Sequence, residues 1–151
     1  MNKIRLTNVK FDDKKATITA DLTSAYEPEL GVKNFIRQFE FSAPNSFTLT
    51  DNIETEKPKI ITSFLHADNL IENASNNSFF FEPLNNSRLL VKVEEPSQPK
   101  TVIEKNILTA PGKPGSVDKG EREERGVRLA ISTKEKTTKA KFVIKMEIQN
   151  K

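Results

Sequence analysis

Residues 138–149 read TKAKFVIKMEIQ, and apolar and polar side chains alternate along this stretch. The apolar side chains share one face: Ala140, Phe142, Ile144, Met146 and Ile148. The other face carries three lysines and a glutamate, with Val143 as its one apolar member. Successive side chains of a strand point to opposite sides of the sheet, so this pattern predicts an antiparallel strand with one face in the core and one in water.

The same alternation recurs in three other stretches. It predicts inward-facing side chains in residues 16–22 (Ala16, Ile18, Ala20, Leu22), 88–94 (Leu89, Val91, Val93) and 127–131 (Val127, Leu129, Ile131). Further strands are expected at residues 3–9, 33–41, 46–51, 59–66, 78–82 and 101–108. About ten short strands joined by Pro-, Asn- and Asp-rich turns predict an all-β antiparallel β-sandwich with little helix.

Two segments carry more particular expectations. Residues 60–66 are apolar on both faces, with Ile60 and Phe64 opposite Ile61 and Leu65, which favours a central strand covered on both sides. Residues 67–74 carry the one helical signal, a turn or two of helix with Asp68 as its cap.

Composition limits the chemistry. The 151 residues suit one domain spanning 1–151, and they contain no cysteine, no tryptophan, one tyrosine and one histidine. Disulfides, thiolate nucleophiles and a His-rich metal site are therefore excluded within this chain, and any His-based catalysis would need His66. No apolar run approaches a membrane span or resembles a signal peptide. The net charge of +3 is too small to indicate nucleic-acid binding.

Charge and glycine are concentrated towards the C-terminus. Residues 109–126 hold four of the five glycines and a dense charge cluster, which predicts a mobile loop. From Thr101 onward there are 12 basic and 7 acidic residues. This excess could attract an acidic polysaccharide, although lysines on an edge strand also commonly prevent edge-to-edge aggregation.

One charge pair stands out on an otherwise apolar face. If a turn at residues 42–46 closes a hairpin, the register pairs Phe41 with Phe47, Phe39 with Leu49 and Arg37 with Asp51. Either charge alone would be costly on that face, and cross-strand neighbours lie close enough for a bidentate pair. We therefore predict a structural ion pair between Arg37 and Asp51.

The motifs in residues 20–66 resemble a known family. The run ADLTSAY at 20–26, the strand RQFEFS beginning at Arg37, the strand ending at Asp51 and the sequence SFLH at 63–66 resemble the β-sheet domain of the heparinase II/III family of polysaccharide lyases. The match covers roughly residues 16–95. Leu22 replaces a usual small residue, Thr48-Leu49-Thr50 replaces a Val-rich strand, and Phe64 stands where Trp is common.

The resemblance implies a role and a location. In that family a large N-terminal helical toroid carries most of the catalytic machinery, and the β-domain, of super-sandwich type, packs against it. We expect an accessory domain of a bacterial lyase, periplasmic or secreted, that forms one wall of an acidic-glycan cleft without nucleic-acid or membrane partners.

The resemblance also suggests site residues. Some members bind a metal through His and Asp; the nearest matches are Asp51 and His66, and the chain offers no second His. We therefore expect no metal, no cofactor and no catalytic residue in this chain. Tyr26, His66, Arg122 and Arg125 are candidate glycan contacts, although a structural role also fits Tyr26 and His66. The alternative is a free-standing carbohydrate-binding or structural and adhesion module, but the missing tryptophan disfavours sugar stacking.

Overall fold

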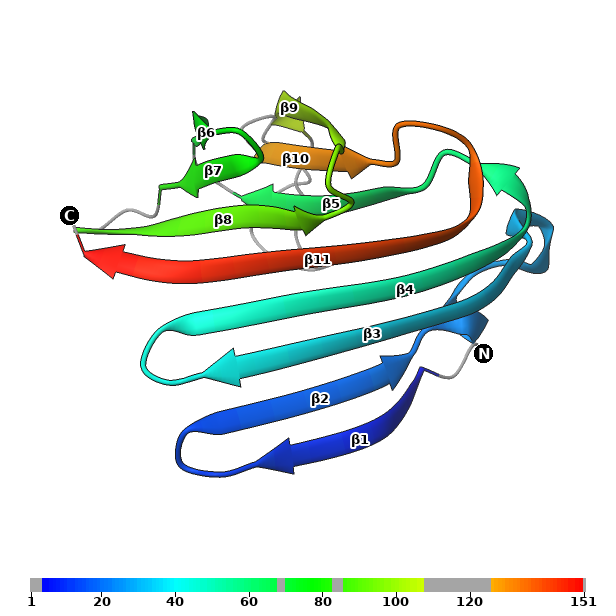
Figure 1. Ribbon diagram of the computed structural model, residues 1–151, viewed down its shortest axis with the longest axis horizontal. Coiled ribbons are helices and arrows are strands. Elements are labelled where there is room, and N and C mark those ends of the chain that lie inside the picture. The colour runs from blue at the N-terminus through cyan, green and yellow to red at the C-terminus, as the bar shows by residue number, and fades with distance from the viewer. Residues whose placement is uncertain (1–3, 68–69, 83–85, 108–125, 151) are drawn as a thin grey trace, which may run out of the picture.

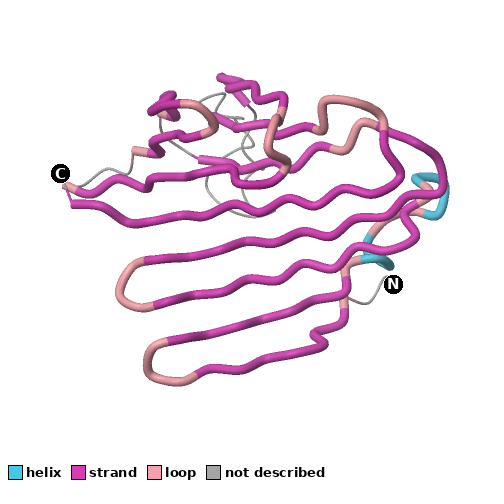
Figure 2. The backbone as a smooth tube through the Cα atoms, viewed as in Figure 1, coloured by secondary structure: helices cyan, strands magenta, loops and turns pink. Residues whose placement is uncertain are grey.

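The computed structural model describes residues 4–67, 70–82, 86–107 and 126–150, and this part of the chain is all-β. Its strands are β1 (Arg5–Phe11), β2 (Lys15–Asp21), β3 (Val32–Ser42), β4 (Ser46–Lys59), β5 (Thr62–Ala67), β6 (Ile71–Ser75), β7 (Ser78–Phe81), β8 (Ser87–Glu95), β9 (Lys100–Ile107), β10 (Gly126–Ser132) and β11 (Thr137–Asn150). Figure 2 shows the helical content, two short 3-10 turns between β2 and β3, η1 (Thr23–Ala25) and η2 (Pro28–Leu30).

The strands form two antiparallel sheets, which confirms the predicted sandwich. The larger sheet has the order β1-β2-β3-β4-β11-β8-β7-β6, and the smaller has the order β5-β10-β9. In Figure 1 the smaller sheet lies over the β11, β8 and β7 side of the larger one, whereas β1, β2 and β3 extend beyond it. The two layers are therefore unequal in width, and the smaller sheet covers the larger one around β11, β8 and β7 but not over β1, β2 and β3.

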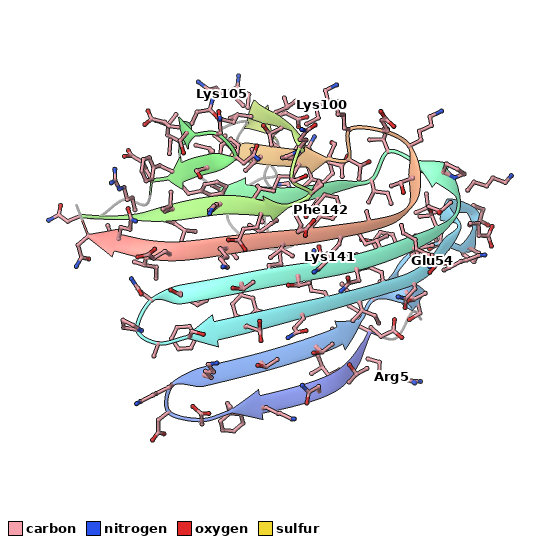
Figure 3. All side chains as sticks on the ribbon, in the orientation of Figure 1. Arg5, Glu54, Lys100, Lys105, Lys141 and Phe142 are labelled. Carbon is pink, nitrogen blue, oxygen red and sulfur yellow. The ribbon has the colours of Figure 1, made fainter. Side chains whose placement is uncertain are left out.

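The core lies where the layers overlap. Phe142 and Ile144 of β11 pack with Val91 of β8 and with Leu129 and Ile131 of β10. Phe142 is labelled in Figure 3. All five are fully buried. These are the inward positions expected from the alternation, because a buried face requires one apolar side chain at every second residue.

Two local predictions were wrong. Residues 71–75 form strand β6 in place of the helical turns expected at 67–74, because Ile71 pairs with Phe81 of β7 and is buried in the core. Asp68, the expected cap, lies outside the described residues. Strand β5 is an edge strand of the smaller sheet and not a central one, and Phe64 on it and Ile60 just before it are exposed, so this segment is not covered on both faces.

Strand β4 is also longer than predicted. It continues from Ser46 to Lys59, and the expected strand at 59–66 begins only at Thr62. The predicted loop at 109–126 lies outside the described residues, apart from Gly126, which begins β10. The described residues contain no helix long and apolar enough to cross a bilayer.

Candidate functional site

The inner face of the larger sheet continues as an apolar surface beyond the smaller sheet. Cross-strand partners lie on the same face of a sheet, so the register traces rows of side chains across it. One row consists of Ile144, Leu49, Phe39, Ile18 and Val9, and the next consists of Met146, Phe47, Phe41, Ala16 and Phe11. Both rows begin in or against the core and end on the outer hairpin of β1 and β2.

Exposure rises along these rows. Ile144 is fully buried, whereas Val9 is 52% exposed and Phe11 is 81% exposed. Ile18, predicted to face the core, points to the predicted face but is exposed, because the smaller sheet does not reach β2. We call the part of this face formed by Val9, Phe11, Ile18, Phe39 and Phe41 the uncovered face. Contiguous exposed apolar surface of this kind typically marks an interaction site.

The structure brings Arg37 and Asp51 together at the border between covered and uncovered halves. Arg37 Nε donates to Asp51 Oδ1 and Arg37 Nη2 donates to Asp51 Oδ2, both at 2.7 Å. Asp51 is only 1% exposed, whereas the Arg37 side chain is 41% exposed. The hydrogen bond to Asp51 raises the pKa of the Arg37 guanidinium above its ordinary value.

A pocket of about 380 Å³ opens beside this pair, between the inner face of β3 and β4 and the free edge of β5. Its apolar lining comes from the side chains of Leu30, Val32, Phe35, Ile53, Ile60, Ile61 and Phe64. Its polar lining comes from Tyr26, Arg37, Asp51, Thr55, Lys59, Thr62 and Ser63. A largely apolar cavity with a few polar groups is the usual character of a binding site.

Aromatic rings fix the walls of the pocket. The ring centroids of Tyr26 and Phe35 lie 5.6 Å apart, and the Arg37 guanidinium carbon lies 5.4 Å from the Phe35 centroid. On the other wall, the guanidinium of Arg128 lies over Phe64 at 4.4 Å and forms an ion pair with Glu104. Such ring and cation contacts hold both aromatic walls in place.

Four polar residues of this pocket were not singled out by the sequence analysis, namely Thr55, Lys59, Thr62 and Ser63, and Ser63 is the most unusual of them. It is 6% exposed, and its Oγ makes no hydrogen bond with any described residue. Buried hydroxyls nearly always have a partner, so an unpaired one at a pocket wall requires an explanation. A signal existed in the sequence: Ser63 stands between Ile61 and Leu65 on the inward face of its strand, where a small polar residue is out of place.

The other predicted site residues are dispersed. Tyr26 lines the pocket with Arg37 and Asp51, whereas His66 is exposed on β5 opposite Arg128 and does not line it. Arg122 and Arg125 lie outside the described residues. Both Asp51 oxygens bind Arg37, and no cluster of three or more His, Asp or Glu side chains suited to a metal exists among the described residues.

By sequence, the chain matches no protein-family model and no curated protein. By structure, heparan sulfate lyase HepC from Pedobacter heparinus superimposes with a TM-score of 0.75 at 14% identity, over 99% of this chain and 22% of that one. A heparinase III structure gives a TM-score of 0.71 at 11% identity, over 97% of this chain and 21% of that one. This chain shares its fold with one part of the heparan sulfate lyases.

The chain thus spans about 22% of the length of HepC. The protein HI1317 matches with a TM-score of 0.56 at 10% identity, over 97% of this chain and 65% of its own. At such identities the likeness establishes the fold. Function has to be argued from the surfaces and side chains of this chain.

Proposed function

We propose that this chain is a non-catalytic accessory β-sandwich domain of a heparinase II/III-like polysaccharide lyase. In this role it supports a helical catalytic domain and forms one wall of a cleft for an acidic glycan, in a periplasmic or secreted enzyme. The observation that carries the proposal is the uncovered face. A domain that occupies about a fifth of a longer lyase needs a surface against which the remainder packs.

The uncovered face suits this use because its apolar rows are continuous with the core. Val9 and Phe11 would lose water contact on docking, which is the main favourable term in domain association. Their strand, β1, is already held by its main-chain register with β2, which in turn pairs with β3, so docking requires little ordering of the backbone. The face thus has the apolar character and the rigidity of a stable interface.

Charge on the smaller sheet suits an acidic glycan. Lys100 and Lys105 lie on the edge strand β9 (Figure 3), are exposed, and make no ion pair with other described residues. By contrast, Lys139 and Lys145 of β11 pair with Glu54 and Glu94. Unpaired surface cations raise the local concentration of an anionic polymer and accelerate its encounter, with an effect that salt weakens.

Two experiments test the proposal. The purified chain is incubated with heparan sulfate while the absorbance of the unsaturated product is followed, with an active heparan sulfate lyase as the positive control. We expect no turnover, because an elimination needs groups that move a proton, and the chain's single tyrosine and single histidine lie apart: Tyr26 lines the pocket, whereas His66 does not. Sustained turnover by the chain alone would contradict the accessory role.

The second experiment concerns docking. The coding sequence upstream of Met1 is read, and the region it encodes is co-expressed with this chain. We expect a helical domain that co-purifies with the wild-type chain and is lost with Val9→Glu. The control is Val102→Glu, which places the same charge at an exposed valine of β9, away from the uncovered face, and should leave co-purification intact. An upstream region without a helical domain would refute the proposal.

A further inference from the structure

Several polar groups in the lining of the pocket beside Arg37 already have partners within the fold. Both oxygens of Asp51 accept hydrogen bonds from Arg37. The Thr55 hydroxyl donates to the carbonyl of Lys57, and the Thr62 hydroxyl is paired with that of Ser132. The polar groups of the lining are thus mostly committed to neighbours within the fold.

Besides the Tyr26 hydroxyl, three donors remain, two on charged side chains and one buried. Nη1 of Arg37 takes no part in the hydrogen bonds found among the described residues, because Asp51 engages only Nε and Nη2. Lys59 Nζ donates one hydrogen bond, to the Leu30 carbonyl at 2.7 Å, and an ammonium has two more to give. The third donor is the unpaired, buried Oγ of Ser63.

The lining also carries a net positive charge, which favours the same kind of ligand as these donors do. Arg37 and Asp51 cancel, which leaves the ammonium of Lys59 as a net positive charge at a largely apolar pocket. Several donors in the lining of one pocket, together with a net positive charge, favour an anionic acceptor with at least two oxygens. A carboxylate meets this requirement and can engage two donors at once.

We propose that this pocket is a binding site for a carboxylate carried on a compact hydrocarbon body. Ser63, Lys59 and Arg37 receive the carboxylate, and Phe35, Phe64 and the aliphatic residues beside them enclose the hydrocarbon. The unpaired Ser63 hydroxyl is the observation that the site explains, because ligand binding supplies the missing partner.

The lining disfavours a sugar acid. A pyranose would bring several hydroxyl groups into the pocket, each of which needs a partner to offset its loss of water. The threonine hydroxyls are committed and seven lining side chains are apolar, so beyond the carboxylate donors only the Tyr26 hydroxyl is left for those hydroxyl groups. The site is therefore distinct from a glycan cleft, and the assignment does not depend on the proposed lyase role.

The test measures binding of 4-methylpentanoate to the full chain by titration of backbone amide NMR signals. For a ligand of this size we expect saturable shifts centred on Ser63 and Arg37, with a Kd of about 1 mM. Two comparators probe the chemistry: 4-methylpentanamide, which lacks the charge, and D-glucuronate, which carries the same carboxylate on a sugar. Both should bind at least about tenfold more weakly.

Variants locate the site. Ser63→Ala should weaken 4-methylpentanoate about tenfold while leaving the melting temperature unchanged or slightly higher, because it removes an unpaired buried hydroxyl. Lys59→Met should also weaken binding, whereas Lys141→Met, the same charge change on the outer face of β11, should not. These changes leave the uncovered face intact, so their outcome is separable from that of the docking experiment.

Three results would overturn the assignment: no saturable binding, tighter binding of D-glucuronate than of 4-methylpentanoate, or undiminished binding by Ser63→Ala. The last result would mean that Ser63 has only a structural role. Binding that shows both the carboxylate preference and the Ser63 dependence would support the site.

Discussion

Replacing Arg37 with methionine should destabilise this fold far more than removal of an ordinary surface charge. The substitution keeps most of the aliphatic stem but leaves the Asp51 carboxylate, 1% exposed, without its two hydrogen bonds of 2.7 Å. Removing one partner of a buried pair typically costs about 3–5 kcal/mol. Because the Arg37 side chain is 41% exposed and water can enter, we expect the lower limit, about 3 kcal/mol.

The assay is urea unfolding at neutral pH, with a thermal melt alongside. For a domain of this size about 3 kcal/mol corresponds to a melting temperature lower by roughly 6–12 °C. The matched control is Lys139→Met, which removes an exposed partner of Glu54 at 3.3 Å and should cost no more than about 1 kcal/mol.

A second variant separates the charge from the packing. In Arg37→Met combined with Asp51→Leu no buried charge remains, so most of the lost stability should return. The reasoning would be refuted if Arg37→Met cost no more than Lys139→Met, or if the double variant were less stable than Arg37→Met alone.

Three further predictions concern other parts of the fold. Phe142→Ala should lower the free energy of unfolding by about 3–5 kcal/mol in denaturant titration, because it empties a fully buried position. Phe11→Ser, at an exposed position, should change this free energy by less than about 0.5 kcal/mol, and equal effects of the two variants would contradict the layer arrangement. Gly31→Ala should lower the free energy of unfolding by about 1 kcal/mol in the same assay, because the φ of +62° at this position is unfavourable for alanine. The added Cβ would meet Glu56 only at ordinary contact distance, so an unchanged unfolding midpoint would argue against this backbone conformation. The pKa of Asp12 is lowered by hydrogen bonds from the backbone amides of Lys14 and Lys15, so this turn contributes stability at neutral pH that is lost as the pH falls through the lowered pKa. NMR titration of the Asp12 carboxyl should give a midpoint below the ordinary value for aspartate, and a midpoint at or above that value would exclude the turn.

Local alternation predicted most of the strands and their inward faces. It identified the inward row of β11, the buried positions of β8 and β10, and the hairpin register that places Arg37 opposite Asp51. These features depend on a period of two residues and on a short turn, both of which are present in the nearby sequence. The motif order in residues 20–66 likewise predicted the fold that the solved lyases share with this chain.

Coverage of the faces could not be predicted in the same way. Ile18 and Ile144 occupy equivalent places in their alternating patterns, yet one is exposed and the other fully buried. The difference arises because the smaller sheet packs over one side of the larger sheet only. Where a second layer lies depends on contacts between residues far apart in the chain, which local periodicity does not contain.

The amino-acid sequence by itself determined the all-β class, the inward side of most strands and the partner of Arg37, because each follows from neighbours within one strand or hairpin. Only the tertiary structure decided that β5 is an edge strand, that the face over β1–β3 is uncovered, and that Ser63 lies unpaired at a pocket wall. The physical reason is that burial is a property of two surfaces in contact, whereas alternation describes one surface alone.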